Sequence, residues 1–101
     1  MARKLNVHFG MPADPAQFER YYVETHAPIA RRLPGLRSFE YGPTVSNLDG
    51  SAPETYWITT LTFDDVASMQ AALASSEGEA TTADMANFAT GSMTVIASKV
   101  M

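Results

Sequence analysis

Alternating apolar and polar residues, at a period of two, predict half-buried β-strands in this chain. In residues 4–10, Leu5, Val7 and Phe9 share one face while polar residues occupy the other. Residues 55–63 (TYWITTLTF) alternate in the same way and are rich in β-branched and aromatic residues, which favour strands. These two stretches are the most regular strands that we predict.

Two further strands have weaker patterns. Residues 36–45 alternate as far as the dipeptide Gly42-Pro43, which favours either an early end or a bulge. Residues 93–100 place Met93 and Val95 on one face. The polar segment 46–53 reads as the loop between the second and third strands.

Between the first two strands, apolar residues take the spacing of an amphipathic helix. Asp14-Pro15 is a typical helix start, and Pro34-Gly35 is a strong turn signal that ends the segment. The residues that recur at helical spacing, and that we expect to face a core, are Phe18, Tyr22, Thr25, Ile29 and Leu33.

Pro28 predicts a break in this helix. A proline cannot donate to the carbonyl of Glu24, its ring crowds that turn, and it disfavours helical angles at the preceding Ala27. His26 therefore lies at the predicted break, one turn after Tyr22 and on the same face. A histidine at an irregular turn is a candidate for facing a cavity, although a core or capping role explains it equally well.

A second helix is predicted for residues 66–74, with Asp64-Asp65 as its cap. Ser76 followed by Glu79 resembles a capping box, so a short helix is expected to follow and to end near Met85–Phe88.

The resulting order is β-α-β-β-α-β within one domain, residues 1–101. This order fits an α+β, ferredoxin-like sandwich with its helices on one face of a four-stranded antiparallel sheet. Either Tyr56 and Ile58 or Trp57 and Leu61 must then lie on the uncovered face. Because a large exposed apolar patch is unusual on a monomer, we expect a homodimer that packs its sheets face to face.

Composition excludes several classes of function. The formal net charge is −4 and the sequence pI is about 4.9, which disfavours nucleic-acid and anionic membrane surfaces. The chain has no cysteine, so disulfides, thiol chemistry and cysteine-ligated metals are excluded. No signal peptide or transmembrane segment is recognisable, and we expect a cytoplasmic protein.

The motif His26-Ala27-Pro28, followed by Leu33-Pro34-Gly35-Leu36, resembles the EthD-like family of dimeric α+β barrel proteins. The aromatic pair Tyr21-Tyr22 and the later segments 77–79 and 84–88 are also similar to that family. The resemblance implies a barrel-forming dimer of ferredoxin-like subunits, each with a small-molecule cavity. It also implies a functional role for His26, but it does not specify a reaction.

Members of this family are associated with ether degradation loci and often have the label of an EthD family reductase. Relatives in the wider barrel superfamily isomerise or cyclise small molecules, oxygenate substrates without a cofactor, or handle haem. No nucleotide fingerprint or phosphate loop is present here, so no cofactor is expected and the reductase label gains no support.

His26 is the main candidate for proton transfer, because imidazole titrates near neutral pH. Tyr22 could hydrogen-bond to His26 or to a substrate; core packing is its simpler explanation. Three aromatic side chains could line an apolar substrate pocket or simply fill the core: Trp57, Phe39 and Phe63, of which Phe63 is better explained as core. Tyr41 is an alternative to Tyr22 for orienting the substrate. His8 is a further substrate-contact candidate, although a satisfied interface histidine is the simpler interpretation.

Other features favour no specific chemistry. Arg31, Arg32 and Arg37 surround the Pro-Gly turn, either to attract an anionic substrate or as solvated surface charges. A metal site built from His8 and His26 would need both on one face of the sheet, and their spacing matches no metal motif.

Two hypotheses remain open. The first is a cofactor-independent enzyme that acts on a hydrophobic aromatic or lactone-like molecule, with His26 moving a proton next to a carbonyl. The second is a non-catalytic small-molecule-binding or accessory protein of a catabolic or biosynthetic pathway. Haem binding through His26 is a third alternative, which the resemblance raises and which would require a larger cavity.

Overall fold

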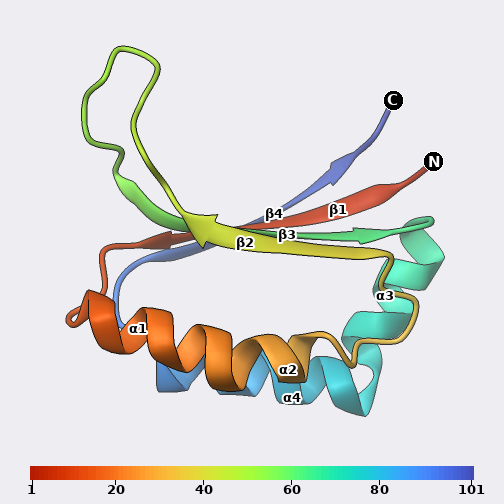
Figure 1. Ribbon diagram of the computed structural model, residues 1–101. Helices are drawn as coiled ribbons and strands as arrows, with labels where there is room; N and C mark the ends of the chain where they lie inside the picture. The colour runs from red at the N-terminus through yellow and green to blue at the C-terminus, as the bar shows by residue number, and fades with distance from the viewer.

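The computed structural model describes the whole chain, residues 1–101, as a four-stranded antiparallel sheet with helices on one face (Figure 1). The strand order is β2-β3-β1-β4, which confirms the predicted ferredoxin-like α+β fold. In chain order the elements are β1 (Arg3–Gly10), α1 (Pro15–Tyr21), a π-helical turn (Tyr22–His26), α2 (Ala27–Ala30), β2 (Ser38–Pro43), β3 (Thr55–Phe63), α3 (Val66–Ala74), α4 (Ser76–Asp84), a 3₁₀ turn (Met85–Asn87) and β4 (Met93–Lys99).

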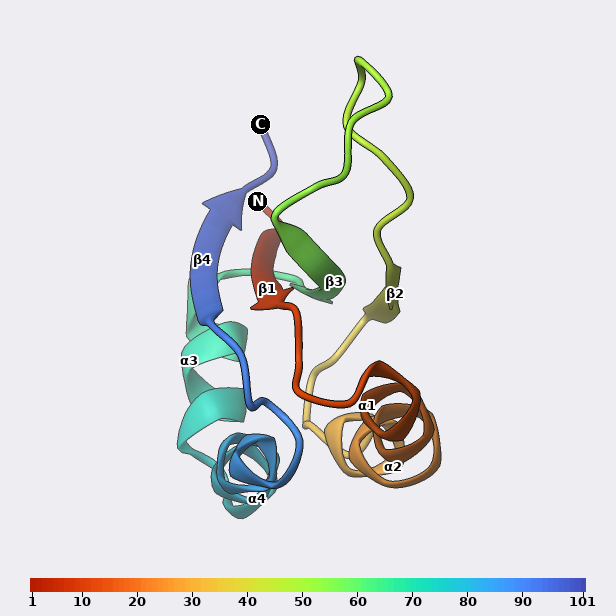
Figure 2. The same cartoon turned by 90° about the vertical axis from the view of Figure 1, so that its left-hand side faces the viewer.

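The helix-covered face of the sheet is where the strands bury their apolar residues. Leu5 of β1 lies opposite Leu61 of β3, and Phe9 lies opposite Trp57. All four side chains are less than a tenth exposed. Figure 2 looks along the strands and shows α4 lying beside α1 and α2 beneath this face. The period-two alternation of β1 and β3 therefore sets which residues can form a site between sheet and helices.

The helices begin at the predicted capping residues, except that the cap of α4 lies one residue earlier than expected. Asp14 accepts a hydrogen bond from the Gln17 N–H, as its predicted capping role requires. The cap of α4 is Ser75 and not Ser76, because Ser75 is extended and accepts from the Gly78 N–H. A Cβ at Gly78 would come within 2.3 Å of the Ala72 carbonyl oxygen, so only glycine permits this tight passage from α3 to α4.

The helix restarts as α2 after an irregular turn that ends at His26, but the predicted departure from helical angles at Ala27 is wrong. Ala27 keeps helical angles (φ −58°, ψ −44°), and α2 runs directly through Pro28. The helix makes room for the proline ring one turn earlier, where the Ala27 N–H donates to the carbonyl of Tyr22, five residues back. This π-helical turn inserts one extra residue and widens the helix just before the proline ring.

The extra residue also rotates the buried stripe. Thr25 is exposed and Ile29 is only half-buried, contrary to the expected helical stripe. Their places in the core are taken by His26, 2 % exposed, and Ala30, 1 % exposed. The irregular turn is therefore what directs His26 toward the sheet.

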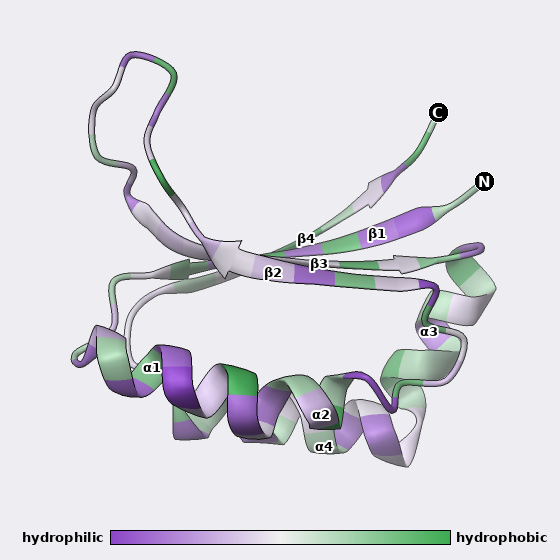
Figure 3. Ribbon diagram, viewed as in Figure 1, coloured by the Kyte–Doolittle hydropathy of each residue, from purple (hydrophilic) through white to green (hydrophobic).

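The uncovered face is less apolar than expected. Trp57 and Leu61 face the helices, and Tyr56 sits at the bulge near Gly10, where its ring packs on Phe18 at 5.6 Å. Ile58 is thus the large β3 side chain left on the open face, and Ile96 of β4, opposite Asn6, lies on that face too. Figure 3 shows apolar and polar residues following one another along β1. None of the helices is both long and apolar enough to cross a membrane.

Candidate active site

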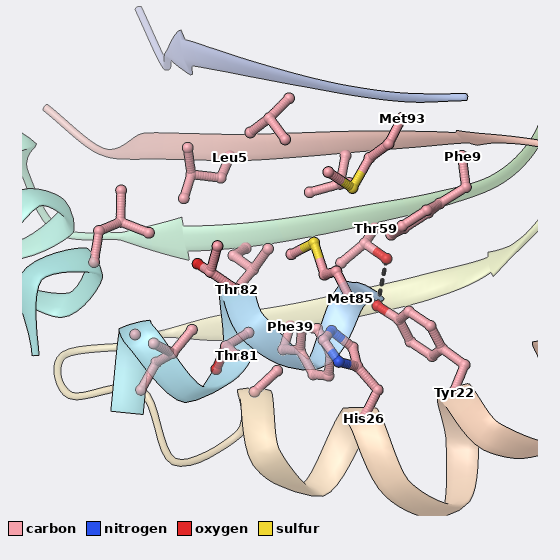
Figure 4. Close-up of a pocket in the computed structure, with 17 residues that line it drawn as sticks. Leu5, Phe9, Tyr22, His26, Phe39, Thr59, Thr81, Thr82, Met85 and Met93 are labelled. Atoms are coloured by element: carbon pink, nitrogen blue, oxygen red, sulfur yellow. Dashed lines mark hydrogen bonds between the residues drawn. The ribbon is translucent and has the colours of Figure 1, made fainter. Parts of the chain in front are cut away.

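A cavity of about 140 Å³, here called the inner cavity, lies between the sheet and the helices (Figure 4). Its walls are mostly carbon: Leu5, Val7, Phe9, Leu33, Phe39, Leu61, Leu73, Met85, Met93 and Val95. The polar side chains in the wall are His26, Tyr22, Thr59, Thr81 and Thr82, and no acidic residue, lysine or arginine lines it. Such an apolar cavity with few polar groups is typical of a small-molecule site.

The inner cavity opens beside β4. This strand is at the edge of the sheet, and its wall residues Met93 and Val95 are 44 % and 50 % exposed. Leu73 of α3 lies on the same rim and is also exposed. A ligand can therefore enter between β4 and the helix pair α3–α4.

His26 projects from the π-helical turn into the inner cavity (Figure 4). Its ring lies 4.6 Å from the Phe88 ring and 5.0 Å from the Tyr22 ring, centroid to centroid. Its Nδ1 atom is 2.9 Å from Oδ2 of Asp84, at the end of α4. Aromatic packing and a carboxylate therefore fix the orientation of the imidazole.

Asp84 is itself held by two donors from outside the cavity wall. The Tyr21 hydroxyl donates to its Oδ1 at 2.6 Å, and the Asn87 amide donates to the same oxygen at 3.0 Å. Burial acts to raise the pKa of Asp84, but the hydrogen bonds that it accepts outweigh burial and lower the pKa. Asp84 is therefore ionised at neutral pH and accepts the Nδ1–H of His26.

This hydrogen bond selects the tautomer of His26. With the proton on Nδ1, the lone pair is on Nε2. Burial lowers the pKa of His26 below its ordinary value of 6.5, and the neighbouring carboxylate opposes this shift only in part. The imidazole is therefore neutral at pH 7 and its Nε2 atom can accept a proton.

Tyr22 contributes a neutral hydroxyl to the same cavity. Its oxygen is hydrogen-bonded to Oγ1 of Thr59 on β3 (dashed line in Figure 4). Burial raises the pKa of Tyr22 to about 12, although hydrogen bonding from Thr59 moderates the shift. The nearby Trp57 indole N–H also lowers this pKa, although it makes no hydrogen bond in the structure. Tyr22 thus remains protonated and can only donate or accept hydrogen bonds.

Of the residues singled out in the sequence, His26, Tyr22 and Phe39 line the inner cavity. Trp57 is buried beside it, with its ring 5.1 Å from that of Tyr22, but it is not part of the wall. Tyr41 lies behind Tyr22 at 4.9 Å and also stays outside the wall.

His8 lies on the opposite face of the sheet from the inner cavity, because it alternates with the buried Val7 and Phe9. A substrate in the cavity cannot reach it. The two histidines are thus on different faces, and no cluster of three or more His, Cys, Asp or Glu side chains could hold a metal ion.

The arginines near the Pro-Gly turn do not line the inner cavity. Arg31 lies over the rings of Phe39 and Tyr41, at 5.4 and 5.9 Å from their centroids. Arg37 makes an exposed ion pair with Asp64 at 2.7 Å. Their surface interpretation is the one that agrees with the structure.

Sequence reasoning missed Asp84, Tyr21 and Thr59 as parts of this site. Asp84 is 58 residues from His26 along the chain, so no local motif links them. A usable signal was present in α4, where the small residues Gly78 and Thr81 share a buried face with Asp84. A carboxylate at the end of such a face is a candidate partner for a buried histidine.

Fold and site together define a ferredoxin-like α+β protein with a histidine–aspartate pair beside an apolar cavity. The EthD domain family matches residues 11–92, and the chain belongs to this family. The chain is 37 % identical over 93 residues to the "uncharacterized 11.0 kDa protein in thcB-thcC intergenic region" of Rhodococcus erythropolis, covering 92 % of this chain and 89 % of that one. An EthD family protein from Bacillus halodurans superposes with a TM-score of 0.91 at 32 % identity, and each chain is fully covered.

Remoter likenesses concern the fold alone. A dimeric ferredoxin-like protein from Jannaschia sp. CCS1 has a TM-score of 0.73 at 20 % identity, over 99 % of this chain and all of that one. SnoaB from Streptomyces nogalater, a cofactor-independent oxygenase, has a TM-score of 0.64 at 15 % identity, over 98 % and 91 % of the two chains. Proteins of this fold therefore include a cofactor-independent enzyme.

Proposed function

We propose that this protein is a small cofactor-independent enzyme that moves a proton on a hydrophobic aromatic or lactone-like molecule. The observation that supports this most is the pairing of His26 Nδ1 with Asp84, which leaves Nε2 as the free base of the imidazole beside an apolar cavity. A neutral imidazole that is oriented by a carboxylate is suited to general base chemistry near neutral pH.

His26 and Tyr22 have complementary roles in this proposal. Nε2 of His26 takes a proton from a carbon next to a carbonyl group, and the C–H electron pair moves toward the carbonyl oxygen. The Tyr22–Thr59 hydroxyl pair donates a hydrogen bond to that oxygen and stabilises its negative charge. The imidazolium then returns the proton to the same carbon or, where a β,γ double bond is conjugated with the enolate, to the γ-carbon, so the step needs no other reactant.

The environments of the two groups agree with these assignments. Burial lowers the pKa of His26 and raises that of Tyr22 to about 12, so the base is unprotonated and the donor is protonated at the same pH. The fold relationship to a cofactor-independent oxygenase is compatible with this chemistry, but does not indicate the reaction.

Non-catalytic binding is the second candidate, because the apolar wall alone would hold a hydrophobic ligand. Haem is a poor fit, since an apolar cavity of about 150 Å³ holds a molecule the size of benzene. The inner cavity is of similar size, about 140 Å³, and would not enclose a porphyrin.

We also propose that the protein is a homodimer that packs through the open sheet face. The helices leave this face uncovered, and the similarly folded Jannaschia protein is dimeric. The face is largely polar, so the interface would be hydrated. Light scattering should give about twice the chain mass of 11.0 kDa; a stable monomer would contradict this proposal.

The test of catalysis is hydrogen–deuterium exchange at the α-carbon of cyclohexanone in D₂O, followed by loss of its proton NMR signal. Wild-type protein should accelerate exchange, and His26→Ala should lower the rate by about 100- to 10,000-fold, the usual contribution of a general base. His8→Ala is the matched control on the other face of the sheet and should exchange at the wild-type rate. A folded His26→Ala protein with undiminished exchange would refute the proposal.

A further inference from the structure

The charges around the inner cavity disfavour an anionic ligand. None of its wall residues is charged at neutral pH, given the neutral His26, and the one wall residue that pairs with a charged group, His26, pairs with the carboxylate of Asp84. The arginines that could have offset a negative charge are engaged elsewhere, Arg31 over aromatic rings and Arg37 with Asp64. An anion would lose its hydration and gain no cation in return.

The size of the inner cavity limits how much of a ligand is enclosed. An apolar cavity of about 150 Å³ accommodates benzene, and the inner cavity has about 140 Å³. One ring therefore fills it. A second ring must remain in the opening beside Met93 and Val95, both of which are about half exposed to solvent.

The hydroxyls of Tyr22 and Thr59 indicate that the ligand has a hydrogen-bond-accepting oxygen. The Tyr22 and Thr59 hydroxyls have two hydrogens between them and share one hydrogen bond, so one O–H is left to donate in either arrangement. A ligand oxygen can accept it. Tyr22, Thr59 and His26 all line the inner cavity, and the Tyr22 and His26 ring centroids are 5.0 Å apart, so one small molecule can contact both the hydroxyl pair and the imidazole.

We infer that the inner cavity takes an uncharged molecule of single-ring size with one hydrogen-bond-accepting oxygen, and that it discriminates against the corresponding anions and against larger ring systems. This inference rests on the proposed site but concerns binding, not turnover. It therefore excludes carboxylates, phosphates and fused polycyclic compounds as the main ligand class.

Three probes test the inference: cyclohexanone, cyclohexanecarboxylate and the two-ring ketone 2-tetralone. Binding is measured at pH 7.5 by titrating each probe and following the His26 ring signals by NMR, without any turnover. Cyclohexanone should bind saturably, and cyclohexanecarboxylate should bind at least about tenfold more weakly because its charge is not compensated in the cavity. 2-Tetralone should bind more weakly than cyclohexanone, since the inner cavity holds one ring and cannot enclose its fused second ring.

The variant Asp84→Asn tests the origin of the discrimination. Removing the Asp84 carboxylate should reduce the ratio of the dissociation constants of cyclohexanecarboxylate and cyclohexanone several-fold. Asp64 is an exposed acid away from the cavity, so Asp64→Asn should leave this ratio unchanged. Three results would overturn the inference: equal or tighter binding of the carboxylate to wild type, equal or tighter binding of 2-tetralone, or no saturable binding of cyclohexanone. Saturable binding without α-proton exchange would instead refute the proposed catalysis while leaving this inference intact.

Discussion

Each face of the sheet has one histidine nearby, and the two residues differ in exposure, in hydrogen-bond partner and in whether they line a cavity. His26 is 2 % exposed, is fixed by Asp84 and contacts an apolar cavity. His8 is half-buried on the open face, opposite Ile58 and Thr94 in the neighbouring strands. Burial, a carboxylate partner and an adjacent cavity, and not the presence of imidazole, are what indicate chemistry.

The largest expected effect concerns stability on the two faces. Phe63, which is fully buried under the helices, should lose about 3–5 kcal/mol of unfolding free energy when changed to Ala, because a large cavity remains. Ile58→Ala on the open face should cost only about 0.5 kcal/mol, as is usual for a partly exposed position. Urea unfolding at low protein concentration measures both; equal losses would mean that the open face is as tightly packed as the core.

The next prediction concerns the partner of His26. Asp84→Asn should lower the exchange rate by about 100-fold or more, because an amide can stabilise the wrong imidazole tautomer, as it does in serine proteases. The exchange assay with cyclohexanone measures this loss. Asp64→Asn serves as the control, because Asp64 makes only an exposed ion pair with Arg37. Retained activity in the Asp84 variant would show that the pair is merely structural.

The pH dependence separates the two histidines further. His26 acts as a base only when it is neutral, and burial lowers its pKa below 6.5. The exchange rate should therefore level off at high pH and fall as pH decreases, with a midpoint below 6.5. The lowered pKa of His26 also affects stability, because the folded state then binds fewer protons than the unfolded state. The stability contribution of His26 is therefore fully present above pH 6.5 and is lost as pH falls through the lower folded-state pKa. A rate–pH profile of the His8→Ala protein should match wild type, and a midpoint above 6.5 would contradict the assignment.

The smallest effect is expected at Tyr21, which touches Asp84 and not the cavity. Tyr21→Phe removes a donor from the carboxylate, which then interacts more strongly with the imidazolium. The midpoint of the rate–pH profile should therefore move to higher pH, with little change in the plateau rate. A large fall in the plateau at an unchanged midpoint would instead indicate a direct role for Tyr21.

Much of the fold could be predicted from local patterns, and the site only in part. The bounds of β3 and α3 agree with the predicted residues 55–63 and 66–74, because alternation and a capping aspartate are local signals. The π-helical turn could not be predicted, since the sequence shows only that Pro28 disturbs a helix and not where the helix absorbs the disturbance. The expected inward position of Thr25 failed for this reason.

The pairing of His26 with Asp84 depends on how α2 packs against α4, and that arrangement appears only in three dimensions. His26 and Tyr22 could be selected from the sequence because they lie one turn apart. Tyr21 and Thr59 could not, because their contacts link residues that are 37 to 63 positions apart. Asp84 could be placed on a buried face of α4, but its pairing with His26, 58 positions away, could not be predicted.

The most direct test of the central claim is the ring-nitrogen NMR spectrum of His26 as a function of pH. In His8→Ala protein, His26 is the only remaining histidine, so its signals need no further assignment. We expect a proton on Nδ1, an unprotonated Nε2 at neutral pH and a pKa below 6.5. A proton on Nε2, or a pKa above 6.5, would contradict the account of His26 as a base oriented by Asp84.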